Sequence, residues 1–289
     1  MNDTDQKIPT NIDWEPLLFN LKKQKLVPFL GAGAALGFDG SPGLPGSSKL
    51  AEALAQECGY PGSDTKDLLR VTQYYALKFG ELRLRESICE KLSPAEMRPG
   101  EVHQILASWP IKVVLTTNYD NLMERAFSKK DKDPARALYK RRGDQEQIKV
   151  PPSADKPLVY KLHGSLEEVD SMVITEDNYI DFLISLIEGN PKLPDAIGAI
   201  FRSDSILFIG YGLKDWNIRV LLRYFRKDED IRSFAVQRNL RVAGNEAAGR
   251  EWESMVLYWE RKNISVYNCD ALAFLRELDR RYREGHANG

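Results

Sequence analysis

The sequence is poor in cysteine and in long apolar runs, and each shortage excludes a class of protein. Its three cysteines, Cys58, Cys89 and Cys269, stand far apart without a C-x-x-C pair, which argues against a zinc ribbon and a disulfide framework. No apolar run approaches the ~20 residues that a membrane-spanning helix needs. The amino end, Met1-Asn2-Asp3-Thr4-Asp5, lacks signal-peptide character, so we expect a cytoplasmic protein with no membrane partner.

Net charge is also nearly absent. The 289 residues sum to a formal charge of −1, which gives no overall attraction to nucleic acid, and we predict no direct nucleic-acid binding. Apolar residues, by contrast, make up 43% of the chain and aromatic residues 10%. This content can build a large core, and we expect residues 1–289 to form a single domain.

Short apolar runs alternate with amphipathic helical patterns, which predicts a doubly wound, Rossmann-like α/β fold with a parallel sheet of about six strands. The expected strands are residues 26–30, 111–115, 157–162, 205–209, 233–237 and 264–267. The charged segment 128–157 has no firm period and leaves room for one edge strand near residues 137–140. Pro28 predicts that the first strand starts late or lies beside a bulge.

The helical patterns predict an insertion after the first strand. The expected helices are residues 12–23, 48–57, 67–79, 81–92, 122–127, 176–187, 195–202, 216–225, 246–261 and 270–284. A capping box at Ser93-Pro94-Ala95-Glu96 predicts one further short turn. About eighty residues separate the first two strands, and a structureless loop of that length is improbable in a compact domain. We therefore expect residues 48–110 to be a helical insertion that covers the crevice above the sheet.

The first expected strand runs straight into Gly31-Ala32-Gly33. A glycine loop at the carboxyl end of a parallel strand lets peptide N–H groups approach a phosphate or ribose, which points to a nucleotide. A lone Gly-x-Gly can also be an ordinary tight turn. The dehydrogenase fingerprint requires a third glycine at closer spacing and an immediate helix. Here the next glycine is Gly37 and an irregular loop follows it, so we disfavour hydride transfer.

Three further strand ends carry polar or glycine residues, and the carboxyl ends of parallel strands meet at one edge of the sheet. These residues are Asn118 and Asp120, His163, and Gly210-Tyr211-Gly212 with Asp215. Each also has a purely structural interpretation. The side chains of Asn118, Asp120 and Asp215 are good helix N-caps. His163 could be a satisfied histidine in a turn, and Tyr211 could pack in the core rather than stack on a base.

Together these motifs resemble a sirtuin-like domain of the NAD-consuming kind found in bacterial anti-phage systems. The matching stretches, in family order, are Gly31-Ala32-Gly33 with Gly43-Leu44-Pro45, Thr116-Thr117-Asn118-Tyr119-Asp120, Lys161-Leu162-His163-Gly164 and Phe208-Ile209-Gly210-Tyr211-Gly212. The chain departs from sirtuin deacylases in lacking the two cysteine pairs of their zinc module. Gly46-Ser47-Ser48 also stands where deacylases carry an aromatic residue and an arginine. We therefore expect no zinc, and water rather than acyl-lysine as the acceptor.

The resemblance implies an NAD glycohydrolase that cleaves NAD to nicotinamide and ADP-ribose as a defence effector. Asn118 is then catalytic and holds the ribose hydroxyls or the attacking water, while His163 takes a proton from either. The implied NAD-binding residues are Gly31, Ala32 and Gly33 at the pyrophosphate, Asp120 at the carboxamide or the developing positive charge, and Gly210, Tyr211, Gly212 and Asp215 at the adenosine half.

The resemblance to short members of the family implies that the chain forms a homo-oligomer and has a HerA-type ATPase as a possible partner. Two other functions remain open. One is an NAD- or ADP-ribose-binding regulatory module without turnover, which intact glycine loops would serve equally well. The other is an NAD-dependent protein deacylase, which the missing cysteine pairs disfavour.

Overall fold

The computed structural model describes residues 8–37, 43–92, 97–140, 143, 145–148, 150–213, 216–225, 231–239 and 246–287. They contain a seven-stranded sheet in the order β3-β4-β2-β1-β5-β6-β7, with every neighbouring pair parallel. The strands are β1 (Leu26–Leu30), β2 (Val113–Thr116), β3 (Ala135–Leu138), β4 (Leu158–Lys161), β5 (Ser205–Ile209), β6 (Ser233–Val236) and β7 (Ile264–Tyr267). The parallel α/β fold is confirmed. The additional strand is β3, an edge strand that begins two residues before the range 137–140.

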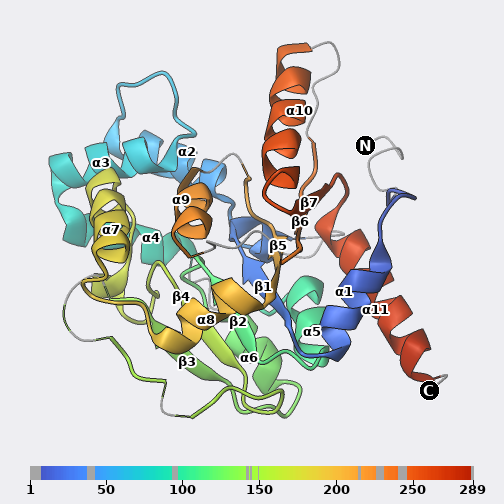
Figure 1. Cartoon of the computed structure of the whole chain (residues 1–289). Helices are drawn as coiled ribbons and strands as arrows, with labels where there is room; N and C mark the ends of the chain where they lie inside the picture. Colours follow the sequence, from blue (N-terminus) through green and yellow to red (C-terminus); the bar gives the residue numbers. More distant parts are fainter. Residues whose placement is uncertain are drawn as a thin grey trace.

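Helices cover both faces of this sheet (Figure 1). One face packs against α7 (Glu176–Glu188), α8 (Asp195–Ser203), α9 (Trp216–Phe225) and α10 (Glu246–Glu260), and the other against α1 (Trp14–Lys22), α5 (Glu101–Ser108), α6 (Leu122–Ser128) and α11 (Ala271–Ala287). Alternate residues of β1 serve the two layers: Val27 and Phe29 face the first, Leu26 and Leu30 the second. Strands covered on both faces are mostly apolar, which explains why short apolar runs marked the strands.

Three helices between β1 and β2 build a smaller core of their own. They are α2 (Ser47–Cys58), α3 (Leu68–Phe79) and α4 (Glu81–Leu92). Leu54, Val71 and Leu84 pack there with Met172 and Ile174, which precede α7. The fourth helix of this stretch, α5, packs on the sheet beside α6 and α11 instead.

The helix ranges expected from the sequence agree with the observed helices to within one turn. The predicted turn at residues 93–96 lies outside the described residues. Among the helices that the structure describes, none is both long and apolar enough to cross a membrane.

Pro28 lies inside a central strand, contrary to the expectation of a late start or a bulge. β1 pairs with β5 along all five residues, but its register with β2 covers only Phe29 and Leu30. Proline has no N–H to donate. The chain meets this restriction by beginning the pairing with β2 one residue after Pro28.

Candidate functional site

The carboxyl ends of β1 and β5 lie side by side in the middle of the sheet. β1 has β2 on one side and β5 on the other, so the order of strands reverses between β1 and β5. Open α/β sheets bind ligands above such a switch point. Here the two loops are in direct backbone contact. The N–H of Gly31 donates to the carbonyl of Ile209 at 3.0 Å, and the N–H of Gly33 donates to the carbonyl of Gly210 at 2.8 Å.

Three glycines permit this contact. A Cβ atom on Gly31 would lie 2.6 Å from the carbonyl oxygen of Gly210, and one on Gly33 would lie 2.7 Å from the Cα of Gly210. Gly210 itself has a φ of +66°, and a Cβ atom there would lie 2.1 Å from the nitrogen of Ala34. The glycines therefore have a packing role besides any approach to a ligand.

The loop also contains a short helix. Contrary to the expectation that an irregular loop follows the glycines, a 3-10 helix begins at Ala32.

The turn after β2 bridges the ends of β1 and β4. The hydroxyl of Thr116 donates to the carbonyl of Leu30 at 3.0 Å and accepts the N–H of Asn118 at 2.9 Å. The side-chain amide of Asn118 donates to the carbonyl of Gly31 at 3.1 Å. On the other side, the N–H of Leu162 donates to the carbonyl of Thr116 at 2.9 Å. Asn118 therefore does not cap a helix, because its side chain reaches across to the glycine loop.

Asp120 serves the first turn of α6. One of its carboxylate oxygens accepts the N–H of Leu122 at 3.0 Å, a local role close to the capping alternative. Its carbonyl accepts a hydrogen bond from the ammonium group of Lys161. Asp215, the last of the expected binding residues along the chain, lies outside the described residues.

His163 follows β4 and is only 9% exposed. Its imidazole packs edge-on against two rings of α7, with centroid distances of 5.5 Å to Tyr179 and 4.9 Å to Phe182. This burial lowers the pKa of the imidazole to about 3, so the ring is neutral near pH 7. Its Nε2 atom is buried and has no hydrogen-bond partner within the described part of the chain. A buried polar atom without a partner costs about 1–3 kcal/mol, so this Nε2 is a candidate contact for a ligand atom.

Tyr211 packs against the core in this structure. Its ring lies 5.4 Å from the ring of Phe29, centroid to centroid, at an angle of 52°. Its Cδ2 atom would lie 2.6 Å from a Cβ atom on Gly31. Tyr211 therefore packs against the core beside the glycine loop, as its structural interpretation expected.

Comparison with known proteins identifies the family. Residues 112–267, more than half of the chain, match the model of the SIR2-like domain. The chain belongs to the SIR2-like family. The resemblance drawn from the four motifs is therefore confirmed.

Curated relatives of this SIR2-like chain are longer proteins. The NAD(+) hydrolase ThsA of Cytobacillus dafuensis is 34% identical over 200 residues, which cover 68% of this chain and 37% of that protein. The NAD(+) hydrolase ThsA of Bacillus cereus (strain MSX-D12) is 30% identical, with coverages of 68% and 39%. Defense-associated sirtuin 2 of Bacillus subtilis is 27% identical over 266 residues, or 88% of this chain and 24% of that protein. The chain spans about two fifths of the length of the ThsA relatives that it matches.

Direct contacts join several of the expected site residues of this SIR2-like domain. Asn118 donates to Gly31, Gly31 donates to Ile209, and Gly33 donates to Gly210, the residue after Ile209. His163 is connected to these residues through the backbone, because the N–H of Leu162 donates to the carbonyl of Thr116. Its Nε2 has no hydrogen-bond partner within the described residues. The contacts of all these residues with NAD stay predictions.

Sequence reasoning assigned no role to the groups that hold the site. Lys161 is 1% exposed and contacts the turn after β2. A lysine at the end of an apolar run, with Leu162 after it, could have signalled a buried charge. Tyr179 and Phe182 stand three residues apart on one helix face, the spacing of a ring pair that can enclose a side chain.

Two cavities of the domain, of about 310 and 170 Å³, lie away from this site. Both lie toward the amino ends of the strands, and Leu158 lines both. Within the described ranges, no group of three or more His, Cys, Asp or Glu residues is placed to hold a metal ion.

We expect Gly210→Ala to reduce the free energy of unfolding by about 3 kcal/mol. The reason is that the new methyl group would meet the backbone of Ala34 at a φ suited to glycine. Gly212→Ala is the matched control, because nothing lies within 4 Å of its Cβ position. Urea unfolding, with the midpoint and slope fitted together, measures both. Equal losses in the two variants would contradict the packing role of Gly210.

We expect His163 to make the protein less stable as the pH falls from 6.5 toward about 3. Above the unfolded pKa of 6.5 the imidazole is neutral in both states, but below it only the unfolded chain binds the proton readily. Between pH 7 and pH 5 the wild type should lose about 2 kcal/mol more than His163→Gln, which does not titrate. Urea unfolding at both pH values measures this difference. An equal loss in both proteins would show that His163 is not held neutral.

Proposed function

We propose that this chain hydrolyses NAD to nicotinamide and ADP-ribose as an effector of anti-phage defence. The observation that carries the proposal is the buried, unpartnered Nε2 of His163, which lies at the same sheet edge as Asn118 and the paired glycine loops. Relatives named NAD(+) hydrolase support the reaction, and a relative named Defense-associated sirtuin 2 supports the setting.

The reaction needs little acid catalysis. Nicotinamide is bound to ribose as a cationic ring, so it leaves as a neutral molecule when its bond to C1′ breaks. The sugar then becomes an oxocarbenium-like cation, which the site must hold and shield. Water forms the new bond to C1′, and its proton passes to Nε2 of His163 and on to solvent. The products are nicotinamide, ADP-ribose and one proton.

The residues suit these steps. Asn118 has both donor and acceptor atoms for a ribose hydroxyl or for the water. The glycine loop of β1 is the candidate cradle for the pyrophosphate, and the loop of β5 for the adenosine half. Asp120 is the candidate partner of the carboxamide or of the developing charge. Water is the acceptor because the chain lacks the cysteine pairs of a deacylase zinc module.

A second candidate is an NAD- or ADP-ribose-binding regulatory module. The low pKa of His163 favours it, because a base with a pKa of about 3 does not readily take a proton in an unliganded site. The same glycine loops would bind the nucleotide in either case. Turnover distinguishes the two functions.

The proposal includes the cytoplasm as the place of action, a homo-oligomer, and a HerA-type ATPase as candidate partner. Subunit association is supported by α7, where Ile180, Ile184 and Ile187 recur at helical spacing and are each about half exposed. Sedimentation of the purified chain, alone and with such an ATPase, separates these possibilities.

We expect Asn118→Ala and His163→Ala to lower kcat for NAD hydrolysis by roughly 100-fold or more while leaving the Kd for NAD within about threefold. Formation of nicotinamide and ADP-ribose is followed by chromatography at several protein concentrations, since assembly can raise the rate per chain. Asn20→Ala is the matched control, because its amide also donates to a backbone carbonyl, that of Pro16 in α1.

One outcome would count against the hydrolase and another against the residue assignment. NAD bound without turnover at every concentration favours the regulatory module. Turnover that survives both substitutions contradicts the assignment of Asn118 and His163.

A further inference from the structure

A lysine is buried beneath the turn that carries Asn118. Lys161 is the last residue of β4, and its side chain is 1% exposed. Burial of a lysine is rare, because the ammonium group loses its hydration and must find partners inside the protein. The three N–H donors of Lys161 therefore need three acceptors.

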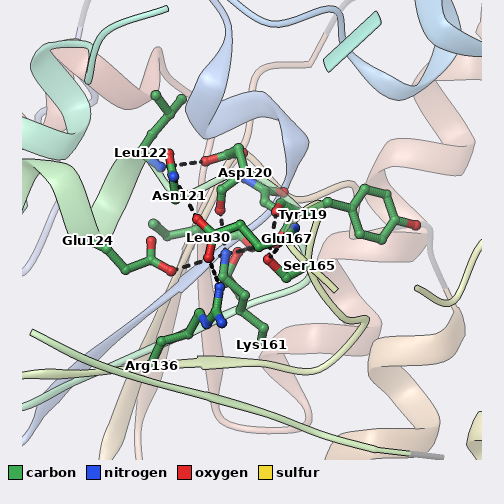
Figure 2. A network of polar contacts seen from close by, with 12 residues as sticks. Leu30, Tyr119, Asp120, Asn121, Leu122, Glu124, Arg136, Lys161, Ser165 and Glu167 are labelled. Atoms are coloured by element: carbon green, nitrogen blue, oxygen red, sulfur yellow. Dashed lines mark hydrogen bonds and ion pairs between the residues drawn. The ribbon is translucent and has the colours of Figure 1, made fainter. Parts of the chain in front are cut away.

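The structure supplies two carbonyls from the turn after β2 and one carboxylate from α6. The ammonium group donates to the carbonyl of Asp120 and approaches the carbonyl of Asn118 at 3.4 Å. Its third neighbour is an oxygen of Glu124 at 3.3 Å, in an ion pair without hydrogen-bond geometry, from a side chain that is 14% exposed. Figure 2 shows Lys161 between Glu124 and the turn at residues 119–121.

The same turn is tied to the segment that follows His163. The carbonyl of Tyr119 accepts the N–H of Leu166 at 3.0 Å, and the hydroxyl of Tyr119 donates to the carbonyl of Val173 at 2.6 Å. Val173 in turn donates its N–H to the carbonyl of His163 at 3.0 Å. A shift of the turn would thus be felt at Asn118 and at His163 together.

We propose that Lys161, held by Glu124, is a positioning residue that fixes residues 117–120 between the ends of β1 and β4. The proposal rests on the NAD hydrolase function, in which Asn118 acts on the ribose or the water. Lys161 does not reach the substrate in this account. It acts through the two carbonyls, which belong to the peptide units Asn118–Tyr119 and Asp120–Asn121 and so fix the backbone that carries the Asn118 side chain.

The substitution Lys161→Met separates a positioning role from a purely structural one. Burial raises the pKa of Glu124, so this carboxyl group can become neutral when its cation is removed. Methionine fills nearly the same volume as lysine, so the core can remain packed in Lys161→Met. What methionine cannot do is donate to the carbonyls of Asn118 and Asp120. The fold should therefore survive while the turn loosens.

The first measurement is hydrogen exchange of residues 117–121 in the full chain. Lys161→Met should raise their exchange rate about tenfold or more. Without the ammonium group, local opening of the turn no longer has to break its hydrogen bonds and therefore costs less free energy. Lys132→Met is the matched control: Lys132 is also partly buried and donates to a backbone carbonyl, that of Trp109 at 2.7 Å, near the amino end of β2. Unchanged exchange of 117–121 in Lys161→Met would overturn the proposal.

The second measurement is NAD hydrolysis by the same variants. Small displacements of a catalytic group can reduce rates about 100-fold, so kcat of Lys161→Met should fall by roughly 30- to 100-fold with a Kd for NAD within about threefold. A Lys161→Met variant with wild-type kcat, or one that loses only thermal stability, would overturn the positioning role.

Failure of the proposed function gives a different pattern. If the wild type binds NAD without turnover, the hydrolase proposal fails, and the exchange of residues 117–121 alone decides the role of Lys161. Faster exchange supports a held turn in an NAD-binding site. Equal exchange in wild type, Lys161→Met and Lys132→Met overturns it.

Discussion

The site depends on one backbone contact, the approach of the β1 loop to the β5 loop. Its two hydrogen bonds join Gly31 to Ile209 and Gly33 to Gly210, and any side chain on these glycines would force the loops apart. The contact lies at the switch point of the sheet, where open α/β sheets bind ligands. The glycines are thus constrained first by each other, and nucleotide binding by the same loops stays a proposal.

The turn after β2 extends this contact to a third and a fourth strand. Asn118 donates to Gly31 on one side, while Lys161 of β4 holds the turn from below. Four loops from distant parts of the sequence thereby share one set of hydrogen bonds. Such a site is pre-organised by neutral backbone groups, with the buried ion pair Lys161–Glu124 as charged support. Pre-organisation of this kind suits stabilisation of a short-lived cation.

The alternation of strands and helices was predictable because both faces of the sheet are covered, which makes most of the strands short, largely apolar runs. The loop glycines, Asn118 and His163 were predictable because they follow such runs. Side-chain direction was not. Nothing in the spacing reveals that Asn118 crosses to Gly31 while Asp120 turns back to α6, since both are good caps. Lys161 also escaped prediction, because its acceptors are carbonyls that only the folded turn brings together.

The low pKa of His163 is compatible with the proposed hydrolysis of NAD once the order of steps is considered. Nicotinamide departs without a proton, so no base is needed until water has begun to bond to C1′. A water attached to an oxocarbenium carbon becomes an oxonium ion, which is a far stronger acid than an imidazolium ion with a pKa of about 3. A weak, neutral, desolvated imidazole is therefore sufficient to take this proton. Its neutrality also avoids repulsion of the cationic nicotinamide ring before the bond breaks.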